Sequence, residues 1–532
     1  MTDRRLGPRF SDAWLCWGGL GLTALLLLFS FPPLGHPFVA FFALIPAALA
    51  AAAAPDWRLW RRAAYGTSWL LWVVLLAWLR HIYPPLGWLG LVLLTAYCAL
   101  YPFLWLVALR WIFPACRDAG APARLLATLG LAGAWGLLEW LRTIAFTGFG
   151  WLPLSASQQG NGVLLTLCAW VGPTGLSIGL VLINLGLASW IIRLRALRAS
   201  ADSLEPLTPT SWFRRLTPEL YLGLAVIAAG FYCTLQQLAR EAPRQEVRIA
   251  ALRTDFDPTE KWDSTKLDKH AKALNSLTVA AGQEKPDVVL WPEAALPLST
   301  DNAGYVTFLR GNVAGAGCPL LIGAIEPRKN GYANSAVVVT AEGLAKPTYA
   351  KRHLVPFGEY VPLADWLPLR KVVPIAQDCV PGEGATLLPL TTRSGFTFLA
   401  GPLVCYEDVF PELAREHALA GADLLVVVTN DGWYGNEAGD AQHTAHSVLM
   451  AVATGIPVAR SGNAGWSGVI THRGILQPTS IPGAPLSASA HLRRDRGEPT
   501  FWVRHGDWAV GLGGLCFGLT YLWRRRRSAL AA

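Results

Sequence analysis

The sequence predicts a bundle of membrane-spanning helices joined to an α/β domain. Hydrophobic residues make up 53% of the 532 residues and charged residues only 15%, which is too apolar for a soluble protein. The apolar stretches are concentrated before residue 240 and after residue 506. Between these limits, short apolar runs alternate with amphipathic stretches, a pattern that is typical of an α/β fold.

Eight apolar stretches come close to the ~20 residues that a helix needs to cross a bilayer. They are residues 13–31, 37–54, 63–80, 86–112, 121–140, 165–192, 219–236 and 506–523. The first follows Arg4, Arg5 and Arg9, as in a signal peptide, but lacks a small-residue cleavage site before the next stretch. We therefore expect this stretch to remain as a helix.

The arginines between these stretches predict the orientation in the membrane. Alternate loops and the tail are basic, through Arg58, Arg61, Arg62, Arg110, Arg117, Arg124, Arg193, Arg195, Arg198, Arg214, Arg215 and Arg524 to Arg527. The intervening loops offer only Arg80 and Arg142. Because basic loops stay cytoplasmic, both termini are expected in the cytoplasm and residues 240–505 outside the membrane. Topology then accounts for the net charge of +9, and no nucleic acid partner is expected.

The predicted domains are a bundle of seven spans (1–236), an extracytoplasmic α/β domain (237–505) and an eighth span with a basic tail (506–532). Within the α/β domain, apolar runs predict strands at 247–252, 288–291, 320–325, 336–340, 396–404, 424–428, 457–460 and 467–471. Amphipathic stretches predict helices at 264–282, 302–315, 411–420 and 440–454.

Cys405 is the most informative residue of the α/β domain. It ends the apolar run 396–404 and precedes the predicted helix 411–420. A strand-to-helix turn would expose the thiol, and a helix N-terminus would favour the thiolate. The alternative is a buried structural thiol, the commoner fate of a cysteine that ends a strand.

Two further charged residues lie at similar places. Glu293 follows the apolar run 288–291 after a proline, and Lys351 opens a loop rich in glycine and proline. Each alone is compatible with an ordinary structural or solvated charge. Together, a thiol, a carboxylate and an amine supply the nucleophile, base and oxyanion partner for acyl transfer through a thioester.

Other chemistries have less support in the sequence. Four histidines lack a motif for a Cys–His protease: His353, His417, His443 and His446. The pair His443-x-x-His446 also lacks the glutamate of a zinc-binding HExxH helix, so neither a metal nor a cofactor is expected. Cys318 and Cys379 could pair in an oxidising compartment, and the sequence does not decide whether they do.

These motifs resemble a known family. The order Glu293, Lys351, Cys405, within Trp-Pro-Glu, Lys-x-His-Leu-Val-Pro-Phe-Gly-Glu and Cys-Tyr-Glu, resembles the nitrilase (carbon–nitrogen hydrolase) superfamily. The predicted spans narrow the resemblance to the apolipoprotein N-acyltransferases of bacterial lipoprotein maturation. Further matches are Trp135-x-x-x-Glu139-Trp140-Leu141-Arg142, Thr147-Gly-Phe-Gly-Trp151, Lys261-Trp262, Asn430-Asp431-Gly432-Trp433-Tyr434-Gly435 and Arg460-x-x-Asn463. The resemblance implies a nitrilase-like αββα sandwich outside the cytoplasmic membrane.

The resemblance also implies a role for each residue. Glu293 would be the general base, Lys351 the cation that stabilises the oxyanion, and Cys405 the nucleophile. Four residues would support the site, Glu359 by orienting it and the others by shaping it: Glu359, Tyr406, Glu407 and Trp262. Trp433 would line a pocket or a lipid entry.

The substrates implied by the resemblance are both held in a bilayer. The acyl donor would be a phospholipid, typically phosphatidylethanolamine, and the acceptor the α-amine of the S-diacylglyceryl cysteine that begins an apolipoprotein. The enzyme would lie in the bacterial inner membrane with its catalytic domain in the periplasm. Segment 361–376, which contains Trp366 and Leu367, is either a core-packed loop or a mobile arm that contacts lipid.

Two other functions compete with this interpretation. A membrane-tethered nitrilase-like amidase would share the three site residues but would need neither eight spans nor an apolar arm. A transporter or flippase with a degenerate outer domain would need ionisable residues along a membrane path. The predicted spans contain few of these, with Glu139 and Arg142 at an edge.

Overall fold

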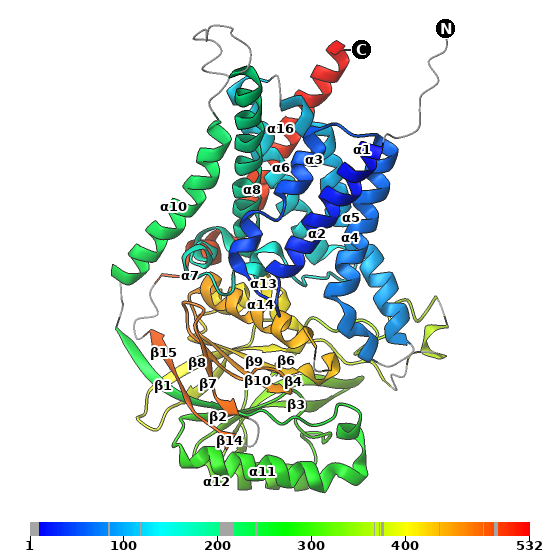
Figure 1. Ribbon diagram of the computed structural model, residues 1–532. Coiled ribbons are helices and arrows are strands. Elements are labelled where there is room, and N and C mark those ends of the chain that lie inside the picture. The colour runs from blue at the N-terminus through cyan, green and yellow to red at the C-terminus, as the bar shows by residue number, and fades with distance from the viewer. Residues whose placement is uncertain are drawn as a thin grey trace. The chain divides into compact units, whose positions relative to one another are not determined.

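A computed structural model describes residues 10–82, 86–116, 119–201, 217–239, 243–366, 368–371, 373, 377–435, 437–481, 484–493 and 498–531. The chain divides into two compact units (Figure 1). The helical unit comprises Met1–Ala239 and Asp507–Ala532, and the α/β unit comprises Arg240–Gly506.

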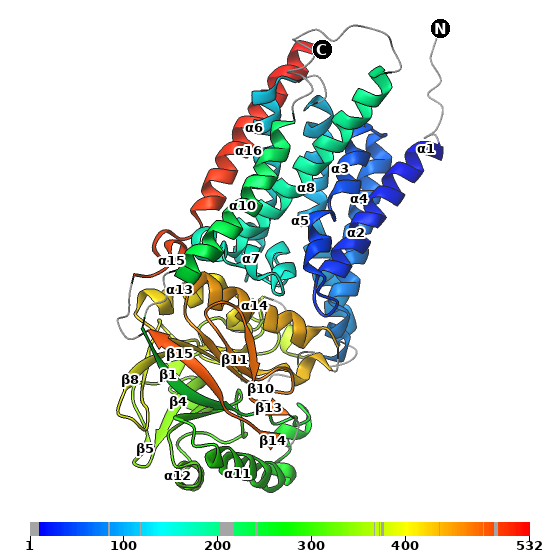
Figure 2. The same cartoon turned by 60° about the vertical axis from the view of Figure 1, so that its left-hand side comes forward.

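The described part of the helical unit is mainly α-helical. Its α-helices are α1 (Phe10–Ala13), α2 (Gly19–Ser30), α3 (Ile45–Ala52), α4 (Trp57–Leu75), α5 (Leu86–Ile112), α6 (Ala121–Ile144), α7 (Gly162–Leu165), α8 (Cys168–Ala201), α10 (Pro218–Ala239) and α16 (Trp508–Ala531). Helix α16 packs along α6, although the two are far apart in sequence (Figures 1 and 2). A Cβ on Gly133 of α6 would lie 2.1 Å from the Gly513 carbonyl oxygen of α16. Small residues thus let these two helices approach closely.

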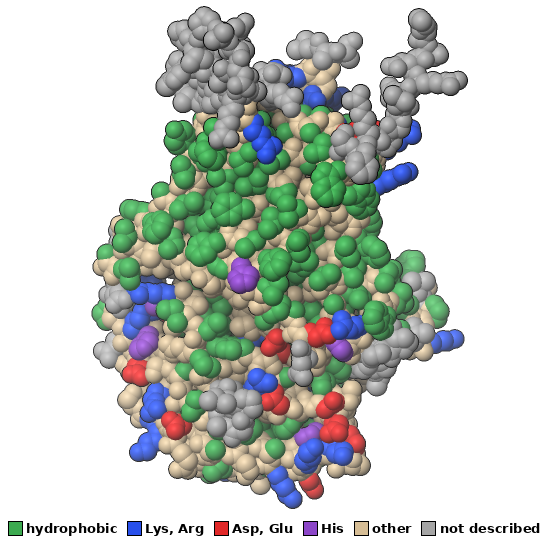
Figure 3. Space-filling view, viewed as in Figure 1, with side chains coloured by type: hydrophobic (Ala, Val, Ile, Leu, Met, Phe, Trp, Pro, Cys, Tyr) green, Lys and Arg blue, Asp and Glu red, His purple; other side chains and the backbone are tan. Residues whose placement is uncertain are grey.

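Among the residues that the structure describes, four helices are long and apolar enough to cross a membrane: Leu86–Cys116, Ala121–Ile144, Cys168–Ala196 and Pro218–Ala239. The predicted stretches 13–31 and 37–54 form shorter apolar helices, Trp14–Ser30 and Pro37–Ala52. The predicted stretch 63–80 was misplaced, because α4 begins at Trp57, where the Asp56 side chain caps it, and ends at Leu75. Figure 3 shows hydrophobic side chains over the surface of this unit, which is expected where lipid replaces water.

The α/β unit contains two main sheets. The first has the order β15-β1-β2-β3-β4-β5, with β6 also paired to β4. Its strands are β1 (Arg244–Ala251), β2 (Val288–Trp291), β3 (Leu320–Arg328), β4 (Gly331–Thr340), β5 (Gly343–Leu344), β6 (Tyr349–Ala350) and β15 (Ala488–Arg493). The second has the order β12-β11-β10-β9-β8-β7. Its strands are β7 (Leu388–Thr391), β8 (Thr397–Val404), β9 (Leu424–Asn430), β10 (Val458–Asn463), β11 (Gly468–Ile470) and β12 (Leu476–Pro478).

The sheets pack face to face, and helices cover their outer faces (Figure 2). Helices α11 (Leu267–Gln283) and α12 (Ala303–Ala316) cover the first sheet, and α13 (Pro411–Leu419) and α14 (Gly439–Thr454) cover the second. Strand β2 is apolar throughout because both of its faces are buried. Val288 and Leu290 belong to the core between the sheets, whereas Val289 and Trp291 belong to the core under α11 and α12. A strand buried on both faces has no polar side.

The direction of the strands brings particular residues together. Strands β1, β2 and β3 are parallel in one sheet, as are β8, β9 and β10 in the other. The carboxyl ends of parallel strands lie at one edge of a sheet, where α/β proteins commonly place their functional side chains. Glu293 follows β2, Cys405 follows β8, and Asp431 follows β9.

Candidate active site

Cys405 lies at a sharp turn directly after β8. It begins the 3-10 turn η9 (Cys405–Val409), and its φ of +52° lies in the left-handed region that side chains other than glycine disfavour. Helix α13 begins at Pro411, as predicted, but the turn η9, which was not predicted, separates Cys405 from its N-terminus. The turn η9 thus lies between the strand and the helix.

The Cys405 thiol is protonated at neutral pH. Burial raises its pKa well above the ordinary value, Glu293 raises it further, and Lys351 opposes this only in part. The expectation that a helix N-terminus favours the thiolate was therefore wrong, because the residue is only 9% exposed and the helix starts too late. A thiol in this state needs a base before it can act as a nucleophile.

Glu293 lies where β2 ends, and it is held tightly at its backbone. A Cβ on Gly323 of β3 would lie only 2.5 Å from the Glu293 Cα, so the strand passes without room for a side chain. The next residue, Ala294, has a φ of +39°. The Glu293 Oε1 accepts a hydrogen bond from Asn334 Nδ2 at 2.6 Å. The carboxylate is thus fixed at both its backbone and its side chain.

Lys351 follows β6 and is fully buried between two carboxylates. Its Nζ lies 2.8 Å from Glu359 Oε2 and 3.8 Å from Glu293 Oε1. Burial alone would lower the Lys351 pKa, but Glu359, Glu293 and Cys405 together raise it above the ordinary value. The ammonium therefore stays charged at every pH at which the protein would work. Its position is suited to stabilising negative charge that develops near Cys405.

Asn334 joins the two carboxylates, a role that the sequence did not predict. Its Nδ2 lies 2.6 Å from Glu293 Oε1 and 2.8 Å from Glu359 Oε1, while its backbone carbonyl accepts a hydrogen bond from the Lys351 backbone N–H at 2.7 Å. Glu359 also accepts from the Val355 N–H at 2.8 Å. One asparagine of β4 thereby fixes the lysine and both carboxylates relative to one another.

Glu407 connects the Cys405 turn to the lysine loop. It is fully buried and accepts from the N–H groups of Val404, Arg352 and His353 at 2.8, 2.7 and 3.1 Å. The Tyr349 hydroxyl donates to it as well, at 2.9 Å. Four donors on one carboxylate leave little freedom to the loop on either side. Glu407 thus acts on the site through the backbone, as expected of a residue that shapes it.

Lys261 is a second buried lysine that the sequence did not single out. Its Nζ donates to the carbonyl oxygen of Glu293 at 2.7 Å. Burial lowers the Lys261 pKa, and the charges of Glu293 and Cys405 raise it only in part, so that it comes to about 8. The Lys261-Trp262 motif could have indicated this lysine, but only the tryptophan was predicted to support the site. Trp262 itself is 53% exposed, so the lysine, and not the tryptophan, contacts the Glu293 backbone.

The other predicted residues lie around this cluster. Tyr406 directly follows Cys405, and its ring packs against Phe410 with centroids 5.1 Å apart. Trp433 is half-buried in the turn η10 (Asp431–Tyr434). Trp366 is 86% exposed, which does not fit a core-packed loop at that position, and Leu367 lies outside the described residues. Cys318 and Cys379 are both free thiols.

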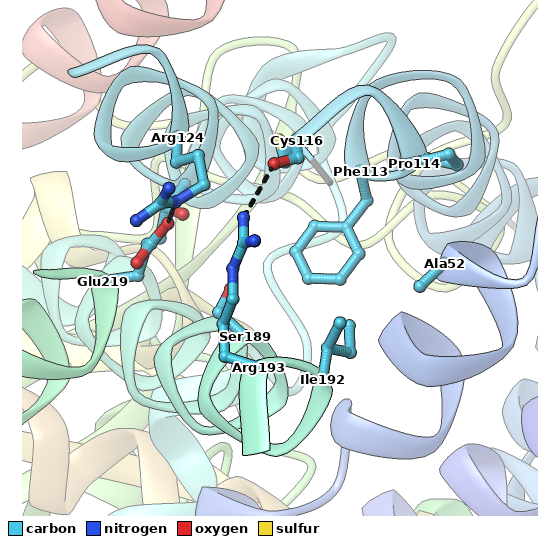
Figure 4. Close-up of a pocket in the computed structure, with 10 residues that line it drawn as sticks. Ala52, Phe113, Pro114, Cys116, Arg124, Ser189, Ile192, Arg193 and Glu219 are labelled. Atoms are coloured by element: carbon cyan, nitrogen blue, oxygen red, sulfur yellow. Dashed lines mark hydrogen bonds and ion pairs between the residues drawn. The ribbon is translucent and has the colours of Figure 1, made fainter. Parts of the chain in front are cut away.

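A separate small cavity lies within the helical unit (Figure 4) and is lined by none of the predicted site residues. In it, Arg124 Nε of α6 contacts Glu219 Oε1 of α10 at 2.6 Å, and Arg193 donates to the Cys116 carbonyl at 3.2 Å. The Arg124 and Glu219 side chains are both buried. This ion pair links two helices, and we interpret it as structural.

Comparison with known proteins identifies the family. An apolipoprotein N-acyltransferase from Geobacter metallireducens is 30% identical over 509 residues, which cover 92% of each chain. This chain belongs to the apolipoprotein N-acyltransferase family. A member of the family from Brucella suis is 30% identical over 419 residues, covering 75% of this chain and 74% of the relative.

Two family models match different parts of the chain. The apolipoprotein N-acyltransferase N-terminal domain matches residues 23–186, and the carbon-nitrogen hydrolase model matches residues 248–481. Among solved structures, a mutant of the amidase from Nesterenkonia sp. AN1 is 19% identical with a TM-score of 0.33, covering 50% of this chain and 98% of the amidase. The family matches and the two packed sheets confirm the predicted nitrilase-like sandwich.

Proposed function

We propose that this protein transfers a fatty acyl chain from a phospholipid to the α-amine of the S-diacylglyceryl cysteine of an apolipoprotein. Membership of the apolipoprotein N-acyltransferase family supports this activity. The residue assignment is supported by the buried position of Cys405 at the end of β8 and by the Lys351 ammonium, which lies 3.8 Å from Glu293 Oε1. Phosphatidylethanolamine is the donor we expect.

The first half-reaction loads the acyl chain onto Cys405. The Glu293 carboxylate takes the thiol proton, and the sulfur attacks the carbonyl carbon of the phospholipid ester. The resulting oxyanion is stabilised by the Lys351 ammonium and by backbone N–H groups that follow Cys405. When the intermediate collapses, the ester C–O bond breaks and the lysophospholipid oxygen takes the proton from Glu293. The product is a thioester on Cys405.

The second half-reaction transfers the chain to the acceptor. The α-amine attacks the thioester carbon, Glu293 takes a proton from the amine, and the C–S bond breaks. The departing sulfur regains a proton, so the enzyme returns to its starting state. Glu359 takes no part in proton exchange and instead holds Lys351 in place. Tyr406, Glu407, Trp262 and Trp433 shape the site, and Trp366 and Leu367 are candidates for lipid contact.

A membrane location is consistent with these substrates. Extracting a lipid into water costs ~0.8 kcal/mol for each CH₂ group, so both substrates are best met within the bilayer. We propose eight spans, with both termini in the cytoplasm and the α/β unit in the periplasm, in the inner membrane. Four described helices support the membrane location by their length and composition.

A topology reporter tests the orientation. A reporter that is active only outside the cytoplasm should work when fused after Glu246 and fail when fused after Ala199, because the arginine-rich loops should remain cytoplasmic. The opposite pattern would place the α/β unit in the cytoplasm and remove the proposed role in lipoprotein maturation.

Trapping the acyl-enzyme tests the mechanism. Phospholipid with a labelled acyl chain, supplied without an amine acceptor, should load one chain that hydroxylamine releases and that maps to the peptide containing Cys405. Cys405→Ala should not load, and Glu293→Gln should load far more slowly because the thiol loses its base. Label that persists in Cys405→Ala would refute the covalent mechanism. Release of free fatty acid without amine acylation, or release of ammonia from small amides, would favour the amidase alternative.

A further inference from the structure

A second cluster of buried charges lies directly beside Cys405, and the mechanism above does not use it. Asp408 of η9, Asp431 of η10, His443 of α14 and Arg460 of β10 are at most 1% exposed. Four separate elements thus converge on one point. Buried charges are costly unless each is paired, so the pairing within this cluster must be close to complete.

The contacts form a closed ring. Arg460 Nη1 lies 2.7 Å from Asp408 Oδ2, and Arg460 Nη2 lies 2.8 Å from Asp431 Oδ2 and from His443 Nδ1. His443 Nδ1 lies 2.8 Å from Asp431 Oδ1, and His443 Nε2 lies 2.6 Å from Asp408 Oδ1. The Ser447 hydroxyl donates to Asp408 at 2.5 Å, and the Thr429 hydroxyl to Asp431 at 2.8 Å.

His443 carries a positive charge in this ring. Its Nδ1 faces the Asp431 carboxylate, and its Nε2 faces the Cys405 carbonyl. Both groups only accept hydrogen bonds, and only the imidazolium donates from both nitrogens. A neutral ring could accept from Arg460 at Nδ1, but it would then set a lone pair against Asp431. Burial alone would lower the His443 pKa, yet Asp408 and Asp431 raise it to about 9 against the opposing charge of Arg460. Two carboxylates then balance two cations.

The His443 ring also contacts the backbone of Cys405. The His443 Nε2–H donates to the Cys405 carbonyl oxygen at 3.3 Å, while Asp408 Oδ1 lies closer to the same nitrogen but off the direction of its N–H. The ring therefore connects the cluster to the main chain of Cys405. The left-handed φ of that residue costs of the order of 1 kcal/mol or more and persists only when its surroundings hold it.

The geometry of a peptide bond extends this contact to the next residue. The carbonyl of Cys405 and the N–H of Tyr406 belong to one planar trans unit and point in opposite directions. A donor that fixes the carbonyl therefore also fixes the direction of the N–H, which is the first backbone donor after the nucleophile. That N–H is the group assigned above to the oxyanion alongside Lys351.

We propose that His443 is a positioning residue that aims the Tyr406 N–H at the acyl oxyanion by holding the Cys405 carbonyl. This inference rests on the proposed acyl transfer. Asp408, Asp431 and Arg460 keep His443 charged and oriented, much as outer groups orient the ligands of a metal site. His443 contacts neither substrate nor the thiol in this mechanism, so its loss should leave the nucleophile and its base in place.

The test compares acyl loading with simple alkylation in the full-length protein. Removing one oxyanion donor typically lowers kcat by ~10²–10³-fold. For His443→Phe, where the donor is misdirected and not removed, we expect a fall of at least ~10-fold, with the KM for phospholipid within ~2-fold of wild type. Iodoacetamide alkylates the thiol without forming an oxyanion. The rate at which the Cys405 peptide is carbamidomethylated should therefore stay within ~3-fold of wild type.

Two further variants separate positioning from folding. His446→Phe, the same change three residues along α14 at an equally buried site, should load at close to the wild-type rate. His443→Phe combined with Asp431→Asn restores the charge balance of the ring, so its Tm should recover relative to His443→Phe while loading stays low. If His443→Phe does not reach the membrane, His443→Met, which also lacks a donor for the Cys405 carbonyl, takes its place in the same comparison.

Three results would overturn the inference. They are loading by His443→Phe at close to the wild-type rate, loading and alkylation that fall in parallel, and a double variant in which loading recovers together with Tm. Failure of the wild-type protein itself to load an acyl chain would instead count against the proposed function, and would leave the geometry around His443 unaffected.

Discussion

Replacing Glu359 with glutamine should leave Lys351 charged but displace its ammonium group. The Glu359 carboxylate lies 2.8 Å from the Lys351 Nζ, and Glu293 lies 3.8 Å from it. At an effective dielectric constant of ~20, unit charges at these separations attract by ~6 and ~4 kcal/mol. The nearer partner therefore dominates. In Glu359→Gln, Lys351 would shift toward Glu293, which is the base that must stay available to the thiol.

The expected cost has two parts. Removing one partner of a buried ion pair typically lowers the free energy of unfolding by ~3–5 kcal/mol, and we expect the lower end because Glu293 remains as a partner. The variant should therefore still fold and insert. Turnover should fall more steeply, by ~10²-fold, because the oxyanion cation is displaced and the base is held in an ion pair. The glutamine can keep its acceptor for the Val355 N–H, so the loop itself should survive.

The assay is the initial rate of amine acylation in phospholipid vesicles, measured beside Tm. Glu416→Gln is the matched control, because Glu416 also pairs with a cation, Arg352, but its side chain is 39% exposed. That variant should lose at most ~1 kcal/mol of stability and little activity. Turnover of Glu359→Gln within ~3-fold of wild type would refute the reasoning and leave Glu359 with a structural role only.

Three other changes test the support around the site. Lys261→Met should lower turnover ~10-fold by freeing the Glu293 carbonyl. The Lys261 pKa falls from 10.5 in the unfolded chain to about 8 in the folded protein. Between these pH values the folded state binds fewer protons than the unfolded state, so stability rises with pH. In thermal melts, the wild-type protein should therefore gain stability relative to Lys261→Met from pH 8 to pH 10. Gly323→Ala should displace Glu293 and abolish acyl loading in the trapping assay, whereas Gly311→Ala, with open space at its Cβ, should not. Glu407→Gln places a donor against backbone N–H groups and should lower the free energy of unfolding by ~1–3 kcal/mol in denaturant titrations.

The sequence predicted some elements of the α/β unit well and others poorly. Strand β4 begins at Gly331 although only 336–340 was predicted, and β7 and β15 were missed. Strand β2 and helix α14 lie within one residue of their predicted bounds, because strong apolar patterns define them. Strands β5, β6 and β12 have only two or three residues each, too few for a periodic pattern. The 3-10 turn after Cys405 was also missed, since its residues carry no signal that separates it from a helix start.

Glu293, Lys351 and Cys405 could be singled out from sequence because each lies at the end of an apolar run or in a loop with distinctive neighbours. The groups that hold these three residues in place could not be singled out from sequence. Asn334 is one polar residue within a strand, and Lys261 is one lysine in a polar segment; each matters only because sheet packing places it against Glu293. The state of the Cys405 thiol was predicted wrongly because burial, which outweighs any helix N-terminus here, depends on the folded core.

Composition and periodicity, which are local properties, were enough to predict the division into apolar spans and an α/β domain and the order of the main strands and helices. The types of side chain that can carry acyl transfer could also be recognised from sequence. Which charges meet depends on how the elements pack. Asp408, Asp431, His443 and Arg460 come from a turn after β8, a turn after β9, a helix and a strand. Their ring exists because parallel strands of one sheet end at the same edge, where burial makes each charge depend on its partners.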